Sequence, residues 1–157
     1  MKYSAIKKYD IANGIGIRVV LFVSGCNHHC KNCHNQITWN PEYGEEFTED
    51  TKKEIYDQLD KEYISGITFS GGDPLHQNNK KEVCNFILEL RDKYPNKDIW
   101  LYTGYTLEQL KEMNDIDINT ILDNINVLVD GPFIEDLKDI TYEWAGSTNQ
   151  RIIKLRE

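Results

Sequence analysis

The sequence has little positive charge and no long apolar stretch. Its 157 residues include 18 lysines and arginines against 26 aspartates and glutamates, a formal net charge of −8, and no segment concentrates the basic residues. This balance argues against binding to the phosphate backbone of nucleic acids. No apolar run approaches the roughly 20 residues of a membrane span, and residues 1–8 lack the apolar stretch of a signal peptide. We therefore expect a cytoplasmic protein that binds neither nucleic acid nor a membrane.

Repeats and low-complexity linkers are also missing. A chain of 157 residues can bury a continuous core without disulfides, so we expect one domain over residues 1–157. Cysteines are few, and three of the four, Cys26, Cys30 and Cys33, fall within eight positions. Because the cytosol keeps thiols reduced, this crowding indicates metal or cluster binding rather than disulfides.

The three crowded cysteines form a Cys-x3-Cys-x2-Cys motif. A cubane iron–sulfur cluster fully ligated by protein takes four cysteines, so three ligands leave one iron open. The spacing differs from the paired Cys-x2-Cys motifs of structural zinc sites, which favours a cluster. A zinc site completed by His28, His29 or His34 is the alternative. The fourth cysteine, Cys84, lies in a predicted helix beside an apolar face, where a free cysteine is usually a small buried hydrophobe.

The apolar pattern predicts a series of short strands. Residues 16–24 are β-branched and apolar with almost no alternation, which is typical of a strand buried on both faces. Further strands are expected over residues 67–70, 98–103 and 126–130, each followed by a glycine-bearing loop. Residues 151–156 alternate weakly and are expected to form a final edge strand.

Helices are expected between these strands. The first is predicted to begin at Thr51, whose spacing to Glu54 suggests a capping box, and to end at residues 65–66. A second precedes the Tyr-Pro pair at residues 94–95, and a third begins with residues 106–111. Apolar residues at helical spacing mark the buried faces: Ile55, Leu59 and Tyr63 in the first helix, and Val83, Phe86, Ile87 and Leu90 in the second.

Strands that alternate with helices call for a mostly parallel sheet with helical crossovers. A complete eight-stranded barrel takes about 250 residues, which is more than this chain has. We therefore expect an α/β fold of the partial, open (β/α) barrel type.

The segment Ser-Gly-Gly-Asp-Pro at residues 70–74 follows a predicted strand directly. Such a segment is common in plain turns, but parallel sheets also place their binding sites at the C-terminal ends of strands. Carbonyl groups from Ser70 to Gly72 could accept hydrogen bonds from an amino group, with the Asp73 carboxylate supplying charge nearby. Thr103 ends the next strand at the same level of the sheet and could line the same cleft.

With these motifs the sequence resembles the radical S-adenosylmethionine superfamily, and within it the group that activates anaerobic ribonucleoside-triphosphate reductase. The three-cysteine motif is specific for the superfamily. The segments Ser-Gly-Gly-Asp-Pro-Leu at residues 70–75 and Thr-Gly-Tyr at residues 103–105, together with the short chain, indicate the group. The likeness covers nearly the whole chain.

The resemblance implies that Cys26, Cys30 and Cys33 hold a [4Fe–4S] cluster whose open iron chelates S-adenosylmethionine. One electron from the cluster would split this cofactor into methionine and a 5′-deoxyadenosyl radical, without a side-chain acid or base. The radical would take a hydrogen from a glycine of the large subunit of anaerobic ribonucleoside-triphosphate reductase. A low-potential carrier such as flavodoxin would supply the electron. Cofactor contacts are expected from Asn32, Cys33, His34, Ser70, Gly71, Gly72, Asp73 and Thr103.

The sequence departs from the superfamily pattern at two of these positions. Asn32 stands where many members have an aromatic or large apolar residue, and Asp73 stands where the usual residue is glutamate. Residues 144–151 are expected to contact the partner. Two alternatives stay open: an activase of another glycyl radical enzyme, of the pyruvate formate-lyase type, or a non-catalytic zinc or electron-transfer module. The module would bind metal without any turnover of S-adenosylmethionine.

Overall fold

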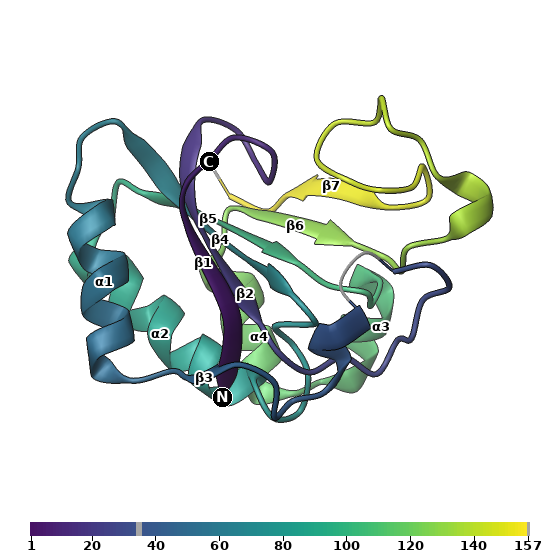
Figure 1. Cartoon of the computed structure of the whole chain (residues 1–157), viewed down its shortest axis with the longest axis horizontal. Coiled ribbons are helices and arrows are strands. Elements are labelled where there is room, and N and C mark those ends of the chain that lie inside the picture. The colour runs from purple at the N-terminus through teal and green to yellow at the C-terminus, as the bar shows by residue number, and fades with distance from the viewer. Residues whose placement is uncertain (34–35, 157) are drawn as a thin grey trace.

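The structure is a computed structural model that describes residues 1–33 and 36–156. In this part of the chain the strands form one seven-stranded sheet in the order β3-β1-β2-β4-β5-β6-β7 (Figure 1). Their bounds are β1 Lys2–Asp10, β2 Ile17–Val23, β3 Glu45–Glu46, β4 Ile64–Gly71, β5 Asp98–Tyr102, β6 Val127–Asp130 and β7 Arg151–Lys154.

The centre of the sheet is parallel and its edges are antiparallel. Strands β2, β4, β5 and β6 pair in parallel, whereas β1 and β3 at one edge and β7 at the other run antiparallel to their neighbours. The predicted α/β class with a mostly parallel sheet is therefore confirmed. Among the described residues no pairing joins β3 to β7, so the barrel part of the prediction stays a prediction.

The helices pack on one face of this sheet, where they enclose the apolar core (Figure 1). Their bounds are α1 Glu49–Leu59, α2 Lys80–Lys93, α3 Leu107–Met113 and α4 Ile116–Asn124, with short 3-10 turns η1 Gln36–Trp39 and η2 Glu135–Leu137. Fully buried residues of neighbouring strands stand side by side in this core, such as Leu21 opposite Phe69 and Phe69 opposite Leu101. Among the described residues, no helix is both long and apolar enough to cross a membrane.

The first helix differs from its prediction at both ends. Helix α1 begins at Glu49 because Thr48 is its N-cap, and Thr51 is the capping partner inside the helix rather than the cap. Ser65 and Gly66 do not end it, since they lie within β4. A Cβ on Gly66 would fall 2.1 Å from the carbonyl oxygen of Asp98, so this glycine allows β4 and β5 to approach. Tyr63 lies outside the helix and is 51% exposed.

The remaining predicted elements are present. Helix α2 buries the predicted apolar face, and Cys84 beside it is 5% exposed, as expected for a small core residue. Thr106 caps α3, and β7 is an edge strand. The prediction omitted β1, β3 and α4. Strand β1 is rich in exposed lysines and becomes a strand through its pairing with β2, which local sequence does not reveal.

Candidate active site

A cavity of about 190 Å³ lies at the C-terminal ends of the parallel strands. Its walls come from the cysteine loop after β2, the glycine loop after β4, the ends of β5 and β6, and the segment between β6 and β7. The lining residues are Cys26, His28, Cys30, Cys33, Thr38, Trp39, Ser70, Gly71, Gly72, Tyr102, Thr103, Gly104, Gly131, Phe133, Gly146 and Gln150. The structure therefore brings together the three cysteines and most of the other residues that the sequence indicated.

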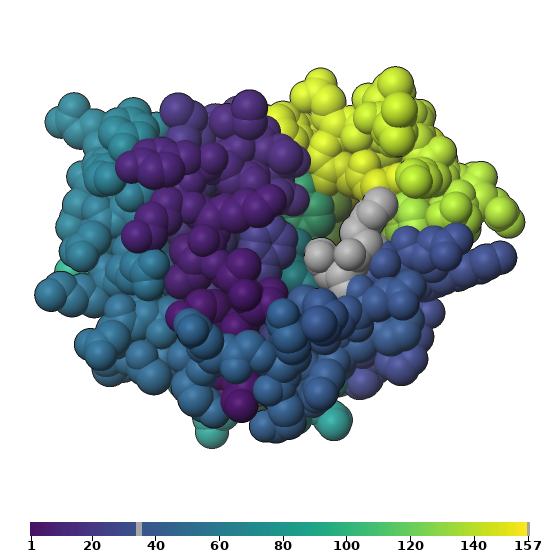
Figure 2. All heavy atoms as spheres, viewed as in Figure 1, coloured from purple at the N-terminus to yellow at the C-terminus, as the bar shows by residue number. Residues whose placement is uncertain are grey.

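A second cavity of about 450 Å³ adjoins the first and shares Tyr102, Gly146 and Gln150 with it. It lies between Asn13, in the turn after β1, and Trp144, in the segment before β7. Figure 2 shows that this side of the molecule is hollowed between the purple N-terminal strands and the yellow C-terminal segment. The cysteine cavity thus adjoins this depression at the three shared residues.

Backbone hydrogen bonds hold the beginning of the cysteine loop to η1. The backbone N–H of Gly25 donates to the carbonyl of Thr38 at 2.6 Å, and that of Cys26 donates to the carbonyl of Trp39 at 3.2 Å. His29 and Asn32 then adopt left-handed backbone conformations, with φ of 50° and 58°. These turns bring the free thiols of the three cysteines into one wall of the cavity.

Burial disfavours the ionised form of two of these thiols. It raises the pKa of Cys26 to about 11 and also raises the pKa of Cys30. Because thiolates are the ligands of metals and clusters, binding at this loop has to release the thiol protons.

Two of the histidines considered as zinc ligands are engaged elsewhere. The Nε2 of His28 lies 2.6 Å from Oδ2 of Asp73, and the ring of His29 stacks on Trp39 with ring centres 4.4 Å apart. His34 lies outside the described residues. Within residues 1–33 and 36–156, no three histidine, cysteine, aspartate or glutamate side chains are grouped so that they could hold one metal ion. Among the described residues, His28 and His29 therefore do not complete a metal site with the three thiols.

Asp73 is 1% exposed, and its carboxylate is turned toward the end of β5. It accepts hydrogen bonds from the hydroxyl of Thr103 at 2.9 and 3.0 Å, from the N–H of Gly104 at 3.0 Å and from the N–H of Leu75 at 2.9 Å. Asp73 and Asn32 are not among the described residues that line the cavity, and Asn32 is exposed. The hydrogen bonds of the Asp73 carboxylate therefore join the glycine loop to the end of β5, and the Thr103 hydroxyl donates two of them.

Gly71 ends β4 and Gly72 begins the loop after it, and the packing of the chain itself requires both glycines. Gly71 has a φ of 113°, and a Cβ there would fall 2.3 Å from the carbonyl oxygen of Val23. A Cβ on Gly72 would fall 2.6 Å from the carbonyl oxygen of Gly25. The N–H of Gly72 also donates to the carbonyl of Val23 at 2.8 Å. The glycine loop thus lies directly against the start of the cysteine loop.

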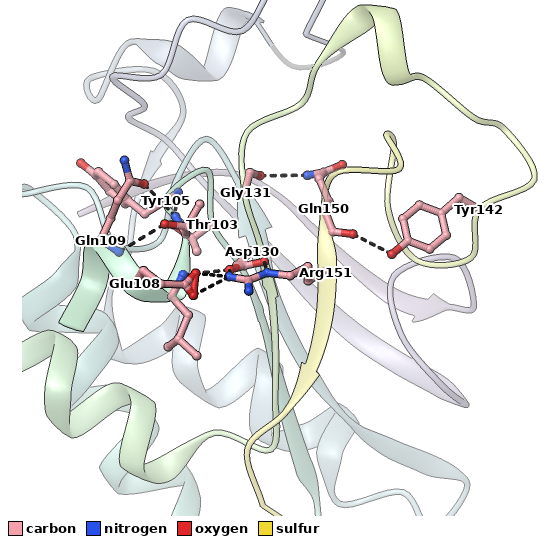
Figure 3. A network of polar contacts seen from close by, with 11 residues as sticks. Thr103, Tyr105, Glu108, Gln109, Asp130, Gly131, Tyr142, Gln150 and Arg151 are labelled. Atoms are coloured by element: carbon pink, nitrogen blue, oxygen red, sulfur yellow. Dashed lines mark hydrogen bonds and ion pairs between the residues drawn. The ribbon is translucent and has the colours of Figure 1, made fainter. Parts of the chain in front are cut away.

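A polar network holds the segment after β6 in place as the opposite wall (Figure 3). Buried Asp130 accepts a hydrogen bond from Nε of Arg151 at 3.1 Å. The side-chain N–H of Gln150 donates to the carbonyl of Gly131 at 3.1 Å, and the hydroxyl of Tyr142 donates to the carbonyl of Gln150 at 2.6 Å. These bonds tie the wall to the ends of β6 and β7.

Sequence reasoning missed three aromatic residues of the cavity wall, Trp39, Tyr102 and Phe133. Tyr102 lies two positions after Trp100 in β5, so the period of a strand would have placed both on the same face. Trp39 lies in a 3-10 turn and Phe133 in a loop, and neither has the regular residue spacing that predicts which way a side chain faces. The indole N–H of Trp39 is buried without a hydrogen-bond partner among the described residues, which leaves a donor for a ligand.

Comparison with known proteins identifies relatives of nearly the same length. Residues 12–153 match the family described as a 4Fe-4S single cluster domain. The chain is 42% identical over 152 residues to the anaerobic ribonucleoside-triphosphate reductase-activating protein of Enterobacteria phage T4, covering 97% of this chain and 93% of the relative. It is also 42% identical to the protein of that name from Escherichia coli (strain K12), covering 99% of this chain and 100% of the relative. The protein of that name from Vibrio cholerae serotype O1 is 42% identical over 97% of both chains.

Proposed function

Because this chain belongs to the family of anaerobic ribonucleoside-triphosphate reductase-activating proteins, with a 4Fe-4S single cluster domain, we propose that it activates such a reductase with S-adenosylmethionine as cofactor. The observation that carries the proposal is the shared cavity of the three-cysteine loop and the glycine loop. When bound, the [4Fe–4S] cluster and S-adenosylmethionine would supply reductive cleavage to methionine and a 5′-deoxyadenosyl radical, which takes a hydrogen from a glycine of the reductase.

In this proposal Cys26, Cys30 and Cys33 hold the cluster. Their thiols are free and line one wall, while His28 and His29 are engaged with other side chains. A set of three protein ligands leaves one coordination position for the cofactor.

The backbone of Ser70, Gly71 and Gly72 receives the amino group of the cofactor. These residues line the cavity together with the cysteines, and the glycines place their backbone within reach because no side chain intervenes. Of the residues expected to border the adenine, Cys33 lines the cavity, Asn32 does not, and His34 lies outside the described residues. Asp73 and Thr103 act indirectly, since their polar groups bond to each other at the end of β5.

The proposed partner is the large subunit of the reductase, which reaches the cysteine cavity through the adjoining depression. That depression lies between the N-terminal turn and residues 142–150, so the segment 144–151 is in position to contact a loop of the partner. The proposal includes a low-potential electron donor such as flavodoxin, a cytoplasmic location, and one domain with the curvature of an open barrel. The superfamily resemblance supports these parts.

The test is an anaerobic assay of the reconstituted protein. The chain is loaded with iron and sulfide, reduced with dithionite and supplied with S-adenosylmethionine, with and without the large reductase subunit. We expect 5′-deoxyadenosine, and a glycyl radical signal on the subunit by electron paramagnetic resonance. Each of Cys26→Ser, Cys30→Ser and Cys33→Ser should abolish both, whereas the matched control Cys84→Ser, in the core, should retain them.

Other outcomes would redirect the assignment. Product without a radical on this subunit would favour another glycyl radical enzyme, such as one of the pyruvate formate-lyase type. No product from protein that retains zinc would favour a non-catalytic module.

A further inference from the structure

His28 lies between two of the cysteines, and its ring is enclosed on several sides. Its Nε2 lies 2.6 Å from Oδ2 of Asp73, and its ring meets that of Tyr105 edge to face with centres 4.5 Å apart. A Cβ on Gly104 would fall 2.4 Å from the His28 ring, so glycine at that position makes room for it. Only 15% of the His28 side chain is exposed. The ring is thus held in one place.

The polarity of the bond between His28 and Asp73 follows from the other partners of the carboxylate. Thr103 and the backbone N–H groups of Gly104 and Leu75 all donate to it. A carboxylate that accepts from several donors is an acceptor for the imidazole as well, so Nε2 of His28 carries the hydrogen. Hydrogen bonds to charged groups are stronger than neutral ones.

This bond connects the two loops that meet at the cavity. At the base of the loops, the N–H of Asp73 donates to the carbonyl of Gly25 at 2.7 Å. The His28 bond joins the same residue to the cysteine loop three positions later, beyond Cys26. The two connections to Asp73 therefore lie on either side of the first cysteine, and Asp73 directly follows the glycine pair.

We propose that His28 is a positioning residue, which acts through Asp73 to set the spacing between the cysteine loop and the backbone of Gly71 and Gly72. Under the proposed function, on which this inference rests, S-adenosylmethionine spans that spacing, from the cluster to the glycine loop. His28 is then neither a metal ligand nor a catalytic residue. Its contribution is to the affinity for S-adenosylmethionine.

Three variants separate this role from a general effect on folding. In His28→Phe the ring contacts with Tyr105 and Gly104 are kept and the N–H donor is lost. In His28→Gln a side-chain N–H donor is returned near the position of Nε2. Lys31→Gln is the matched control in the same loop, because Lys31 is exposed and is not among the residues that line the cavity.

Each variant is reconstituted, and its iron and sulfide content is measured. The electron paramagnetic resonance signal of the reduced cluster is then titrated with S-adenosylmethionine. We expect His28→Phe to hold as much cluster as the parent but to need about tenfold more S-adenosylmethionine for the half-maximal change. In the turnover assay KM for S-adenosylmethionine should rise while kcat changes little. His28→Gln should recover most of the affinity, and Lys31→Gln should match the parent.

The proposal is overturned if His28→Phe titrates like the parent, if it fails to hold the cluster, or if His28→Gln does not recover affinity. A parent protein that holds the cluster without responding to S-adenosylmethionine would contradict the proposed function instead. In that case, hydrogen exchange of the cluster-loaded proteins still tests the role of His28, because it needs no S-adenosylmethionine. The amides of Gly71, Gly72 and Asp73 should exchange faster in His28→Phe than in the parent or in Lys31→Gln, and equal rates would reject the spacing role.

Discussion

The indole rings of Trp100 and Trp144 meet edge to face, with ring centres 5.9 Å apart and an interplanar angle of 76°. Trp100 is a buried residue of β5, whereas Trp144 belongs to the segment before β7 and has a left-handed φ of 71°. The hydroxyl of Tyr102 also donates to the carbonyl of Trp144. Through these contacts β5 holds the segment before β7, which forms one wall of the second cavity.

We expect Trp144→Gly to loosen this wall. Glycine accepts the left-handed conformation without strain, so the variant removes the ring and leaves the backbone unstrained. Loss of a half-buried tryptophan and its aromatic contact should lower the free energy of unfolding by about 2 kcal/mol, measured in urea. Proteolytic cleavage within residues 131–150 should also become faster. Trp144→Phe is the control and should keep most of the stability; cleavage at the parental rate in Trp144→Gly would show that the ring does not hold the segment.

The thiol of Cys26 should respond unusually to pH in the cluster-free protein. Burial holds its pKa at about 11, so the reactive thiolate is scarce near neutral pH. The rate of alkylation by iodoacetamide should therefore rise about tenfold for each pH unit and level off only near that value. Mass spectrometry of the Cys26 peptide measures the rate. In urea-unfolded protein the same thiol should level off earlier, near the ordinary cysteine pKa; identical profiles would mean that the folded chain does not bury the thiol.

Alanine at Gly71 should be much less tolerated than alanine at Gly131. Both glycines have a positive φ, 113° and 96°, but a Cβ on Gly71 would collide with the backbone of Val23, whereas nothing lies within 3.7 Å of one on Gly131. Gly131→Ala should cost about 1–2 kcal/mol of unfolding free energy from the backbone conformation alone. Gly71→Ala should cost about 3 kcal/mol or more because β2 has to move as well. If the two variants lose equal free energy of unfolding in urea, Gly71 is not in the close contact with Val23 described above.

Arg18 should not be replaceable by lysine. The guanidinium is fully buried, donates to the hydroxyl of Thr68 at 2.8 Å and to the carbonyl of Ile67 at 2.9 Å, and forms an ion pair with Asp98 at 2.8 Å. Burial lowers the pKa of Arg18, yet the group keeps its charge because arginine titrates far above neutral pH. A lysine ammonium cannot reach these partners together, so Arg18→Lys should lower the free energy of unfolding by about 3 kcal/mol. Arg156 is exposed, so Arg156→Lys serves as the control and should unfold like the parent. Equal free energies of unfolding for the two variants would show that the contacts of the Arg18 guanidinium do not stabilise the fold.

Much of the fold follows from local patterns. The continuous apolar run of β2 and the helical spacing in α2 are each contained in a short stretch of sequence. Strand β2 was predicted near its observed bounds, and α2 was predicted with its buried face and its C-terminal end. The start of α1 was misplaced because Thr48 and Thr51 are both residues that can cap a helix; in the structure Thr48 is the N-cap and Thr51 its partner in the capping box. Strand β1 was missed because its exposed lysines hide a strand that exists through pairing with β2.

At the candidate active site, too, some features follow from the local sequence and others only from the tertiary structure. The spacing of the cysteines and the position of the glycine loop after a strand are local features. The sequence by itself therefore determined which side chains are close together in the chain and at which end of the sheet they lie. Only the tertiary structure decided where individual side chains face. It bonds the Asp73 carboxylate to Thr103 and Gly104 at the end of β5 and brings Phe133 into the cavity wall. His28 meets Asp73 across 45 positions of sequence. Such contacts depend on the register and crossover of distant strands, which no local spacing encodes.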